Sequence, residues 1–359
     1  MAEDSISRRN FLTTMAVTTA SASLAEPSDV VQPTRSRAAN MPIKVVCNEK
    51  LSEAEVNQIK SAGKNIELQM AASQDALKKC IAEAEVVLGR LDGDTVKLAK
   101  NLKWFQNWGA GMENVLSKEL IEHPCQVTNM QRTFAPVISE TAIALLLSLT
   151  RGLTQVSIPA FQKKEYKEAD DISLDDLYGK TIGIVGMGGI GSETARRLHY
   201  GFNMKVLATD AKPMPKPEFV AELHDPSWLM EMVPQVDVLM SAAPLTKETK
   251  QLFDSEVFSK MKPSAYFINV SRGGLVDQDA LVKALKEKKI RGAGLDVVSP
   301  EPLPASHPLW TCPNLVITPH NSGEAPIRQV RLMALVSENI RRYSNGLPLL
   351  NVVDKAKGY

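Results

Sequence analysis

The sequence predicts an α/β protein with two doubly wound parallel-sheet domains and a cleft between them. Short apolar runs of strand length alternate with stretches of helical pattern along most of the chain, as parallel sheets with crossover helices require. The 359 residues are enough for about two domains. In the second half, a glycine-rich turn joins one apolar run to a helical stretch.

The first half carries the elements of one sheet. Its apolar runs are short and bounded by polar or turn residues, which is typical of strands. The predicted strands span 43–47, 66–70, 86–88 and 104–108. The predicted helices between them span 52–62 and 75–84. The last strand leads into a Gly-Ala-Gly turn at 109–111.

A long apolar helix is predicted at 139–153, with the sequence SETAIALLLSLTRGL. The stretch has almost no polar face, so we expect burial on most sides, either between domains or against a second subunit. From this helix we expect a homodimer. A helix that lies only between the two domains is the alternative.

The turn at 186–191 has the spacing of a phosphate-binding loop. The apolar run 182–185 precedes it, and a helical stretch follows. Gly186 permits the tight turn, Gly188 lets the backbone approach a pyrophosphate, and Gly191 permits close packing of helix on strand. The start of the helix supplies amides and a positive dipole, so we expect a dinucleotide here.

An acid follows the next predicted strand, 205–209. Asp210 stands where a carboxylate would accept hydrogen bonds from the adenosine ribose hydroxyls. This predicts NAD as the cofactor and makes NADP less favourable, since a 2′-phosphate would meet the charge of Asp210. Lys212 lies two residues on and softens that repulsion.

The remaining elements complete the domain division. Further strands are predicted at 236–240, 265–269, 294–297 and 315–318, and the helix predicted at 328–345 is long enough to return to the first domain. The division is a signal peptide at 1–25, a linker at 26–41, a substrate-binding domain at 42–140 completed by 325–359, and a nucleotide-binding domain at 141–324.

Composition narrows the range of ligands. The net charge is +1 and the basic residues are scattered, so we expect no nucleic-acid partner. The four cysteines are far apart, with no CxxC and no histidine at metal-ligand spacing, so we expect buried thiols and no metal site. No apolar run approaches the roughly 20 residues of a membrane span. A small-molecule substrate is expected.

The first 25 residues resemble a twin-arginine export signal. Arg8 and Arg9 precede Phe11-Leu12, a mildly apolar stretch follows, and small residues at 20–25 offer a cleavage site. We therefore expect an exported, periplasmic protein. The alternative is a basic tail on a cytoplasmic enzyme.

Three loops at predicted strand ends, 269–274, 296–302 and 318–320, carry unusual chemistry. With the GMGGIG turn, they resemble the D-isomer-specific 2-hydroxyacid dehydrogenase family, and the resemblance runs from residue 43 to the end. It implies a flavodoxin-like substrate domain and a Rossmann NAD-binding domain. Met112 and Glu113 depart from the family, which often has a small apolar residue and an aspartate there.

The loop residues suit the reduction of a 2-oxo acid. Arg272 offers a planar fork of donors for a carboxylate and the adjacent carbonyl. His320 is suited to general acid-base catalysis, because imidazole exchanges protons near neutrality. The resemblance adds Glu301 as the residue that orients the imidazole. It also implies that Asp296 receives the nicotinamide carboxamide, and that amides of 109–111 hold the substrate carboxylate.

The predicted site residues fall into three groups. The catalytic residues are Arg272, Glu301 and His320. The substrate-binding residues are Gly109, Ala110, Gly111 and Arg272. The cofactor-binding residues are Gly186, Gly188, Gly189, Ile190, Gly191, Asp210, Ala243, Pro244, Thr249, Val270, Arg272, Asp296 and His320.

The predicted function is an NAD-linked oxidoreductase that interconverts a 2-oxo acid and a D-2-hydroxy acid, of the glyoxylate, hydroxypyruvate or phosphoglycerate type. One alternative is a non-catalytic protein of the same fold that binds and senses a dinucleotide. Another is an exported enzyme that retains its cofactor and exchanges hydride between two substrates.

Overall fold

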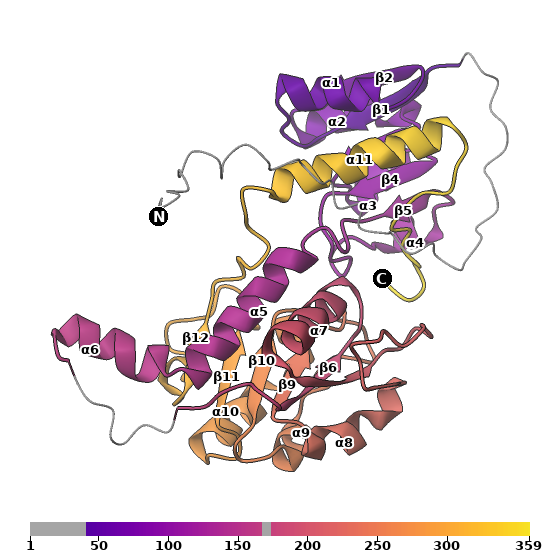
Figure 1. The fold of residues 1–359 in the computed structure, drawn as a ribbon. Coiled ribbons are helices and arrows are strands. Elements are labelled where there is room, and N and C mark those ends of the chain that lie inside the picture. Colours follow the sequence, from indigo (N-terminus) through magenta and orange to yellow (C-terminus); the bar gives the residue numbers. More distant parts are fainter. Residues whose placement is uncertain (1–40, 167–173) are drawn as a thin grey trace, which may run out of the picture.

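The computed structural model describes residues 41–166 and 174–359. Within these ranges the chain forms two lobes, each built on a parallel β-sheet (Figure 1). The signal peptide predicted at 1–25, and the linker at 26–41 except for its last residue, lie outside the described residues. We call the two parts the substrate lobe and the nucleotide lobe.

The substrate lobe has a five-stranded sheet in the order β2-β1-β3-β4-β5, with every neighbouring pair parallel. This is the flavodoxin-like order, as predicted. The strands are β1 (Ile43–Cys47), β2 (Ile66–Met70), β3 (Val86–Gly89), β4 (Trp104–Asn107) and β5 (Gln126–Thr128). The helices are α1 (Glu53–Ser61), α2 (Gln74–Cys80), α3 (Gly93–Leu98), α4 (Lys118–Glu122) and the returning α11 (Arg328–Ser344).

Both faces of this sheet are covered by apolar side chains. The neighbouring residues Val45 and Val46 of β1 belong to two different buried cores, because successive side chains of a strand point to opposite faces. Leu332 and Val336 of α11 pack in the core of Val45, next to α1 (Figure 1). The last long helix therefore packs on the first lobe.

The nucleotide lobe has a seven-stranded parallel sheet in the order β12-β11-β10-β9-β6-β7-β8. The chain leaves β6 toward one edge and later returns to β9 on its other side, which is the Rossmann type of strand order. The strands are β6 (Thr181–Val185), β7 (Lys205–Thr209), β8 (Glu222–His224), β9 (Val238–Ser241), β10 (Tyr266–Asn269), β11 (Gly292–Leu295) and β12 (Leu315–Ile317). The helices are α5 (Ala135–Thr150), α6 (Ile158–Lys163), α7 (Gly189–Phe202), α8 (Leu229–Met232), α9 (Ser255–Lys260) and α10 (Gln278–Lys286).

Several predicted boundaries differ from the structure. The apolar helix begins four residues before the predicted 139, with Pro136 in its first turn, and ends at Thr150. The strand predicted at 294–297 is β11, which lies two residues earlier; its two glycines hid the start of the strand. The three-residue strands β5 and β8 were not predicted, since they are too short to show a periodicity.

Helix α5 packs against α7 and strands β10 to β12 of the nucleotide lobe. A Cβ at Gly294 would lie 2.8 Å from the Cβ of Leu145, so the missing side chain at Gly294 allows α5 to approach β11. The boundary predicted at 140/141 falls inside this helix. Among the described residues no single helix is long and apolar enough to span a membrane; only α5 and 153–163 together, bent by 60°, meet that test.

Candidate active site

The glycine turn between β6 and α7 can be built only with glycines at two positions. Gly186 has φ +97°, and a Cβ there would lie 2.7 Å from the backbone nitrogen of Ala243. A Cβ at Gly191 would lie 1.9 Å from the carbonyl oxygen of Gly186. The turn is therefore tight, and α7 packs directly against it, as predicted from the spacing.

The start of α7 fits the pyrophosphate of a dinucleotide. A Cβ at Gly188 would meet no atom within 4 Å, so the space beside this residue is open. No side chain of the described residues caps the helix, which leaves its first amides for a ligand. Amides and a positive dipole at one place favour an anion. Gly189 and Ile190 form the first turn of α7.

Arg132 lies against this turn, which the sequence did not predict. A Cβ at Gly189 would lie 2.9 Å from the Cα of Arg132, so the backbone of Arg132 touches the start of α7. Arg132 has φ +69° and precedes α5, far from the glycine turn in sequence. Only the fold brings this basic residue to the predicted phosphate site.

Asp210 ties the glycine turn to the loop after β7. Its Oδ2 accepts the backbone N–H of Met187 at 2.7 Å, and its Oδ1 accepts the N–H of Lys212 at 2.7 Å. A carboxylate has about four lone-pair sites, so both oxygens keep acceptor capacity for ribose hydroxyls. The acid stands at the end of β7, beside the turn, as predicted.

The loop after β9 stands beside the turn and supplies three of the predicted cofactor residues. Ala243 is buried against Gly186. The hydroxyl of Thr249 donates to the carbonyl of Pro244 at 2.7 Å, which closes this loop on itself. Val270 is buried at the end of β10.

His320 and Glu301 form a hydrogen-bonded pair. The Nδ1 of His320 lies 2.7 Å from Oε2 of Glu301, and Oε1 of Glu301 accepts the N–H of Val298 at 3.0 Å. The His320 side chain is 45% exposed, so its other nitrogen can reach a ligand. The resemblance implied this pairing, and the structure brings the two residues together.

Asp296 fixes the loop that carries His320. Its side chain is buried and accepts hydrogen bonds from the hydroxyl of Thr318 at 2.6 Å and from the N–H of Ser322 at 3.2 Å. The N–H of His320 donates to the carbonyl of Asp296 at 2.9 Å, which helps to hold His320 at φ +52°. Asp296 thus positions the histidine backbone, a role that the sequence did not predict.

Arg272 reaches across to the substrate lobe. Its Nε donates to Oε1 of Glu113 at 2.5 Å, and the two side chains are 30% and 29% exposed. A Cβ at Gly111 would lie 2.0 Å from Nη2 of Arg272. The predicted carboxylate-binding arginine and the predicted glycine turn therefore meet. Burial raises the pKa of Glu113, but the charge of Arg272 lowers it and the net result is below the ordinary value.

Two buried asparagines hold the turn that faces Arg272. The side-chain amide of Asn107 donates to the carbonyls of Gly109 at 3.0 Å and Gly111 at 3.2 Å. The amide of Asn129 donates to the carbonyl of Ala110 at 2.8 Å. The three carbonyls of the turn are thus bound by the protein. The sequence did not single out these asparagines, because their partners are backbone atoms.

The described part of the chain holds no group of three or more His, Cys, Asp or Glu that could bind a metal ion. All four cysteines are free thiols. Cys47 and Cys125 are buried, and burial raises the pKa of Cys47 to about 11. Cys80 and Cys312 are only partly buried, which differs from the expectation of four buried thiols.

The chain is similar to several known proteins. The family model "D-isomer specific 2-hydroxyacid dehydrogenase, NAD binding domain" matches residues 143–322. The glyoxylate reductase of Thermofilum pendens is 33% identical, over 75% of this chain and 80% of that protein. The glyoxylate/hydroxypyruvate reductase B of Yersinia pestis is 32% identical, over 79% of this chain and 87% of that protein.

A solved structure shows the same fold. It is the NADPH-dependent glyoxylate/hydroxypyruvate reductase of Sinorhizobium meliloti, in complex with NADP and sulfate, with a TM-score of 0.74 and 26% identity. The match covers 88% of this chain and 99% of that one. The residues matched by the family model include the glycine turn, Arg272, Glu301 and His320. This chain belongs to the family of D-isomer specific 2-hydroxyacid dehydrogenases.

Proposed function

We propose that this protein reduces a small 2-oxo acid, such as glyoxylate or hydroxypyruvate, to the corresponding 2-hydroxy acid, which has the D configuration where C2 is a stereocentre. As a member of its family it is an NAD(P)-dependent oxidoreductase of 2-oxo and 2-hydroxy acids. One observation supports the residue roles best. Arg272 and the His320–Glu301 pair follow neighbouring strands of one sheet, and Arg272 touches Gly111 of the other lobe.

Each of the three catalytic residues has its own proposed role. The nicotinamide cofactor, when bound, supplies the hydride that reduces C2 of the oxo acid. His320 gives the carbonyl oxygen a proton, so that the C=O double bond becomes a C–OH single bond. Glu301 holds Nδ1–H and leaves the other nitrogen for that proton. The guanidinium of Arg272 binds the carboxylate and polarises the adjacent carbonyl.

The structure suits NAD and also admits NADP. Asp210 can accept hydrogen bonds from both ribose hydroxyls, which favours NAD. Lys212 is bonded to Asp210 through its backbone, and its side chain brings a positive charge to the same loop. The related reductase of Sinorhizobium meliloti binds NADP. We propose NAD as the preferred cofactor, tested by comparing kcat/KM for NADH and NADPH.

The first experiment follows NADH absorbance with purified protein and glyoxylate, hydroxypyruvate, pyruvate or larger 2-oxo acids. We expect NADH consumption, and a loss of about 10²–10⁴-fold in kcat for His320→Ala, because the general acid is removed. His224→Ala is the matched control, since that histidine side chain is also 45% exposed and lies away from the pair. Equal rates in both variants would contradict the role of His320. Nucleotide binding without turnover would favour the alternative function, a non-catalytic protein that binds and senses a dinucleotide.

We propose export from Arg8, Arg9 and the small residues that follow. An exported enzyme would meet no free NADH pool, so it would have to retain its cofactor and exchange hydride between two substrates. Cell fractionation of the wild type and an Arg8→Lys, Arg9→Lys variant tests this. Export of the wild type alone supports the proposal, and cytoplasmic location of both contradicts it.

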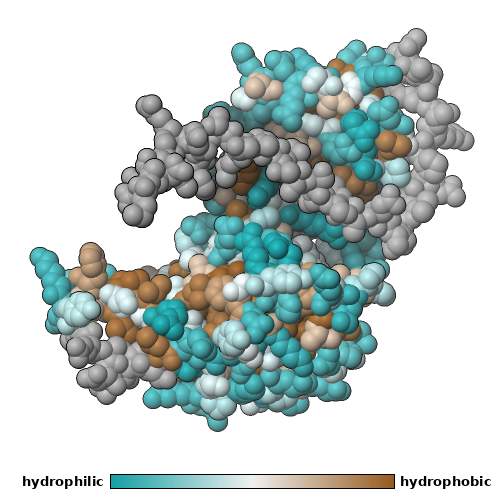
Figure 2. Space-filling model, viewed as in Figure 1, coloured by the Kyte–Doolittle hydropathy of each residue, from teal (hydrophilic) through white to brown (hydrophobic). Residues whose placement is uncertain are grey.

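We also propose a homodimer formed through the nucleotide lobe. Helix α6 projects from this lobe (Figure 1). Hydrophobic residues gather on this side of the nucleotide lobe (Figure 2), and Leu153, Ile158 and Phe161 have exposed side chains. The Phe161 side chain is 85% exposed, which is unusual for so large an apolar side chain unless another subunit covers it.

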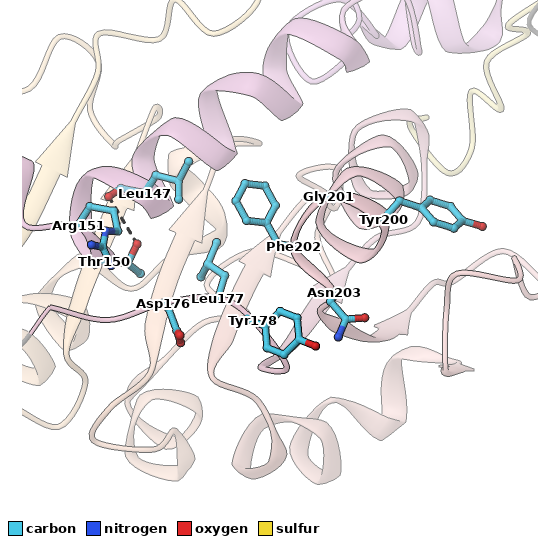
Figure 3. A pocket seen from close by; sticks show the side chains of 10 residues that line it. All are labelled: Leu147, Thr150, Arg151, Asp176, Leu177, Tyr178, Tyr200, Gly201, Phe202 and Asn203. Atoms are coloured by element: carbon cyan, nitrogen blue, oxygen red, sulfur yellow. Dashed lines mark hydrogen bonds between the residues drawn. The ribbon is translucent and has the colours of Figure 1, made fainter.

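A hollow of about 380 Å³ opens on the same lobe (Figure 3). It lies at the C-terminal end of α7, whereas the glycine turn lies at the helix start. The helix has 14 residues, or about 20 Å of length, so the hollow is not the nucleotide site. Its lining residues are Leu147, Thr150, Arg151, Asp176, Leu177, Tyr178, Tyr200, Gly201, Phe202 and Asn203. It provides a second, partly apolar surface for a partner subunit.

A further inference from the structure

The segment 351–359 is anchored on the substrate lobe. The N–H of Val353 donates to the carbonyl of Val127 in β5 at 2.8 Å. The amide of Asn351 donates to the carbonyl of Gln131 at 2.9 Å. Lys355 donates to the carbonyls of Leu120 at 3.1 Å and of Cys125 at 3.2 Å. These bonds hold the segment at the edge strand, beside the connection to the nucleotide lobe.

The end of this segment folds back in a turn around Asp354. Its Oδ1 accepts the N–H groups of Ala356 at 3.0 Å and Lys357 at 3.1 Å. Its own N–H donates to the carbonyl of Tyr359 at 3.1 Å, and its carbonyl accepts the N–H of Gly358 at 2.8 Å. The turn therefore fixes the position of Tyr359.

The ring of Tyr359 contacts the nucleotide lobe at its ribose-binding loop. The Nζ of Lys212 lies 4.4 Å from the centre of the ring, within cation–π distance. The backbone of Lys212 is bonded to Asp210, so the ring stands beside the acid that is expected to bind the ribose.

The Tyr359 side chain is partly buried at this contact, and burial raises the pKa of its phenol. The contact with Lys212 places the ring on the loop after β7, at the side of the glycine turn where the ribose is expected.

We propose that Tyr359 is a cofactor-positioning residue, supplied by the substrate lobe, whose ring forms a wall of the adenosine subsite. The inference rests on the proposed nucleotide site at the glycine turn. A planar ring offers its face to a planar base, and base–aromatic contacts of this kind are sequence-tolerant and common in nucleotide binding. The contact with the ring also orients the ammonium group of Lys212, which belongs to the loop after β7.

The test is equilibrium binding of NADH, AMP and nicotinamide mononucleotide to the full-length protein. We expect Tyr359→Ala to weaken the binding of NADH and of AMP about fivefold or more, because the loss of a stacked aromatic side chain has an effect of this size. Tyr359→Phe keeps the ring and should bind like the wild type. Nicotinamide mononucleotide should bind equally to all variants, because it lacks the adenosine half. A purely structural role of the ring would not distinguish the two halves of the cofactor.

Tyr178→Ala is the matched control, because this exposed tyrosine lies at the distant hollow on the nucleotide lobe. It should bind all three nucleotides like the wild type. Unchanged or tighter AMP binding by Tyr359→Ala would overturn the inference, as would equal weakening of AMP and nicotinamide mononucleotide. Absence of NADH binding in the wild type would overturn the nucleotide site itself, and this inference with it.

Discussion

Glu113 accepts a hydrogen bond from one N–H group of Arg272. Arg272 is the residue proposed to bind the substrate carboxylate. Nε of Arg272 lies 2.5 Å from the Glu113 carboxylate, so a substrate carboxylate must share the guanidinium with it. We therefore expect the charge of Glu113 to affect the affinity for the substrate.

We expect Glu113→Gln to lower KM for glyoxylate about threefold, or roughly 0.7 kcal/mol, because a competing negative charge is removed. The effect on kcat should be smaller. Steady-state kinetics measure both, with Glu122→Gln, an exposed glutamate of α4, as the control. A raised KM would instead mean that Glu113 orients Arg272 for the substrate.

The same pair makes stability depend on pH. The folded pKa of Glu113 is below its ordinary value. The resulting stability is present above the unfolded pKa, about 4.3, and is lost as pH falls through the folded pKa. Between about pH 5 and pH 3 the wild type should lose more free energy of unfolding than Glu113→Gln, by up to about 1 kcal/mol, since the pair is partly exposed. Urea unfolding at several pH values measures this, and parallel curves for the two proteins would refute it.

Two glycines of the turn before α7 have different roles, one in the backbone conformation and one in ligand binding. Gly186 is needed for the backbone, since its φ is +97° and a Cβ would touch Ala243. Gly188 is different, because a Cβ there meets nothing within 4 Å. The open space beside Gly188 is the place where the pyrophosphate is expected.

Two alanine variants separate these roles. Gly186→Ala should reduce the free energy of unfolding by about 1–3 kcal/mol, because alanine must adopt a strained backbone. Gly188→Ala should keep the unfolding temperature but weaken NADH binding, because its methyl group fills the space for the phosphates. Thermal unfolding and NADH titration test both. Gly201→Ala, which also meets no atom within 4 Å, is the control. Normal NADH binding by Gly188→Ala would contradict the placement of the pyrophosphate.

At the scale of the whole molecule, contacts between the lobes join the parts of the site. Arg272 bonds to Glu113, and Lys212 contacts Tyr359; in each pair one residue comes from each lobe. Arg132 touches Gly189 where the chain crosses to α5. The proposed substrate and cofactor sites therefore both contain residues from the two lobes.

A charged substitution on α6 tests the proposed homodimer. We expect Phe161→Glu to shift the protein from dimer to monomer, because a charge would be buried in the apolar surface around α6. Light scattering after size exclusion gives the mass of each species. Lys164→Glu, on a neighbouring residue, is the control for the added negative charge. A monomeric wild type would refute the proposal.

Local sequence patterns predicted much of the fold. The predicted bounds of β1, β2 and β7 agree with the structure. Strands β1 and β7 are mainly apolar and are followed by Asn48 and Asp210, whereas β2 alternates apolar and polar residues. The glycine turn, Asp210 and the loops with Arg272, Glu301 and His320 were identified from short motifs, whose backbone demands are local. The sequence by itself thus determined the two sheets, the nucleotide turn and the family.

Several contacts between distant residues became visible only in the folded structure. Glu113 and Arg272 are 159 positions apart, and neither neighbourhood indicates the other. The same holds for Arg132 at Gly189 and for Tyr359 at Lys212. Local sequence encodes backbone preference and burial, but contacts between lobes depend on how two separately folded sheets are placed by their connections. That placement is why the substrate and adenosine ends of the site contain residues that no motif predicted.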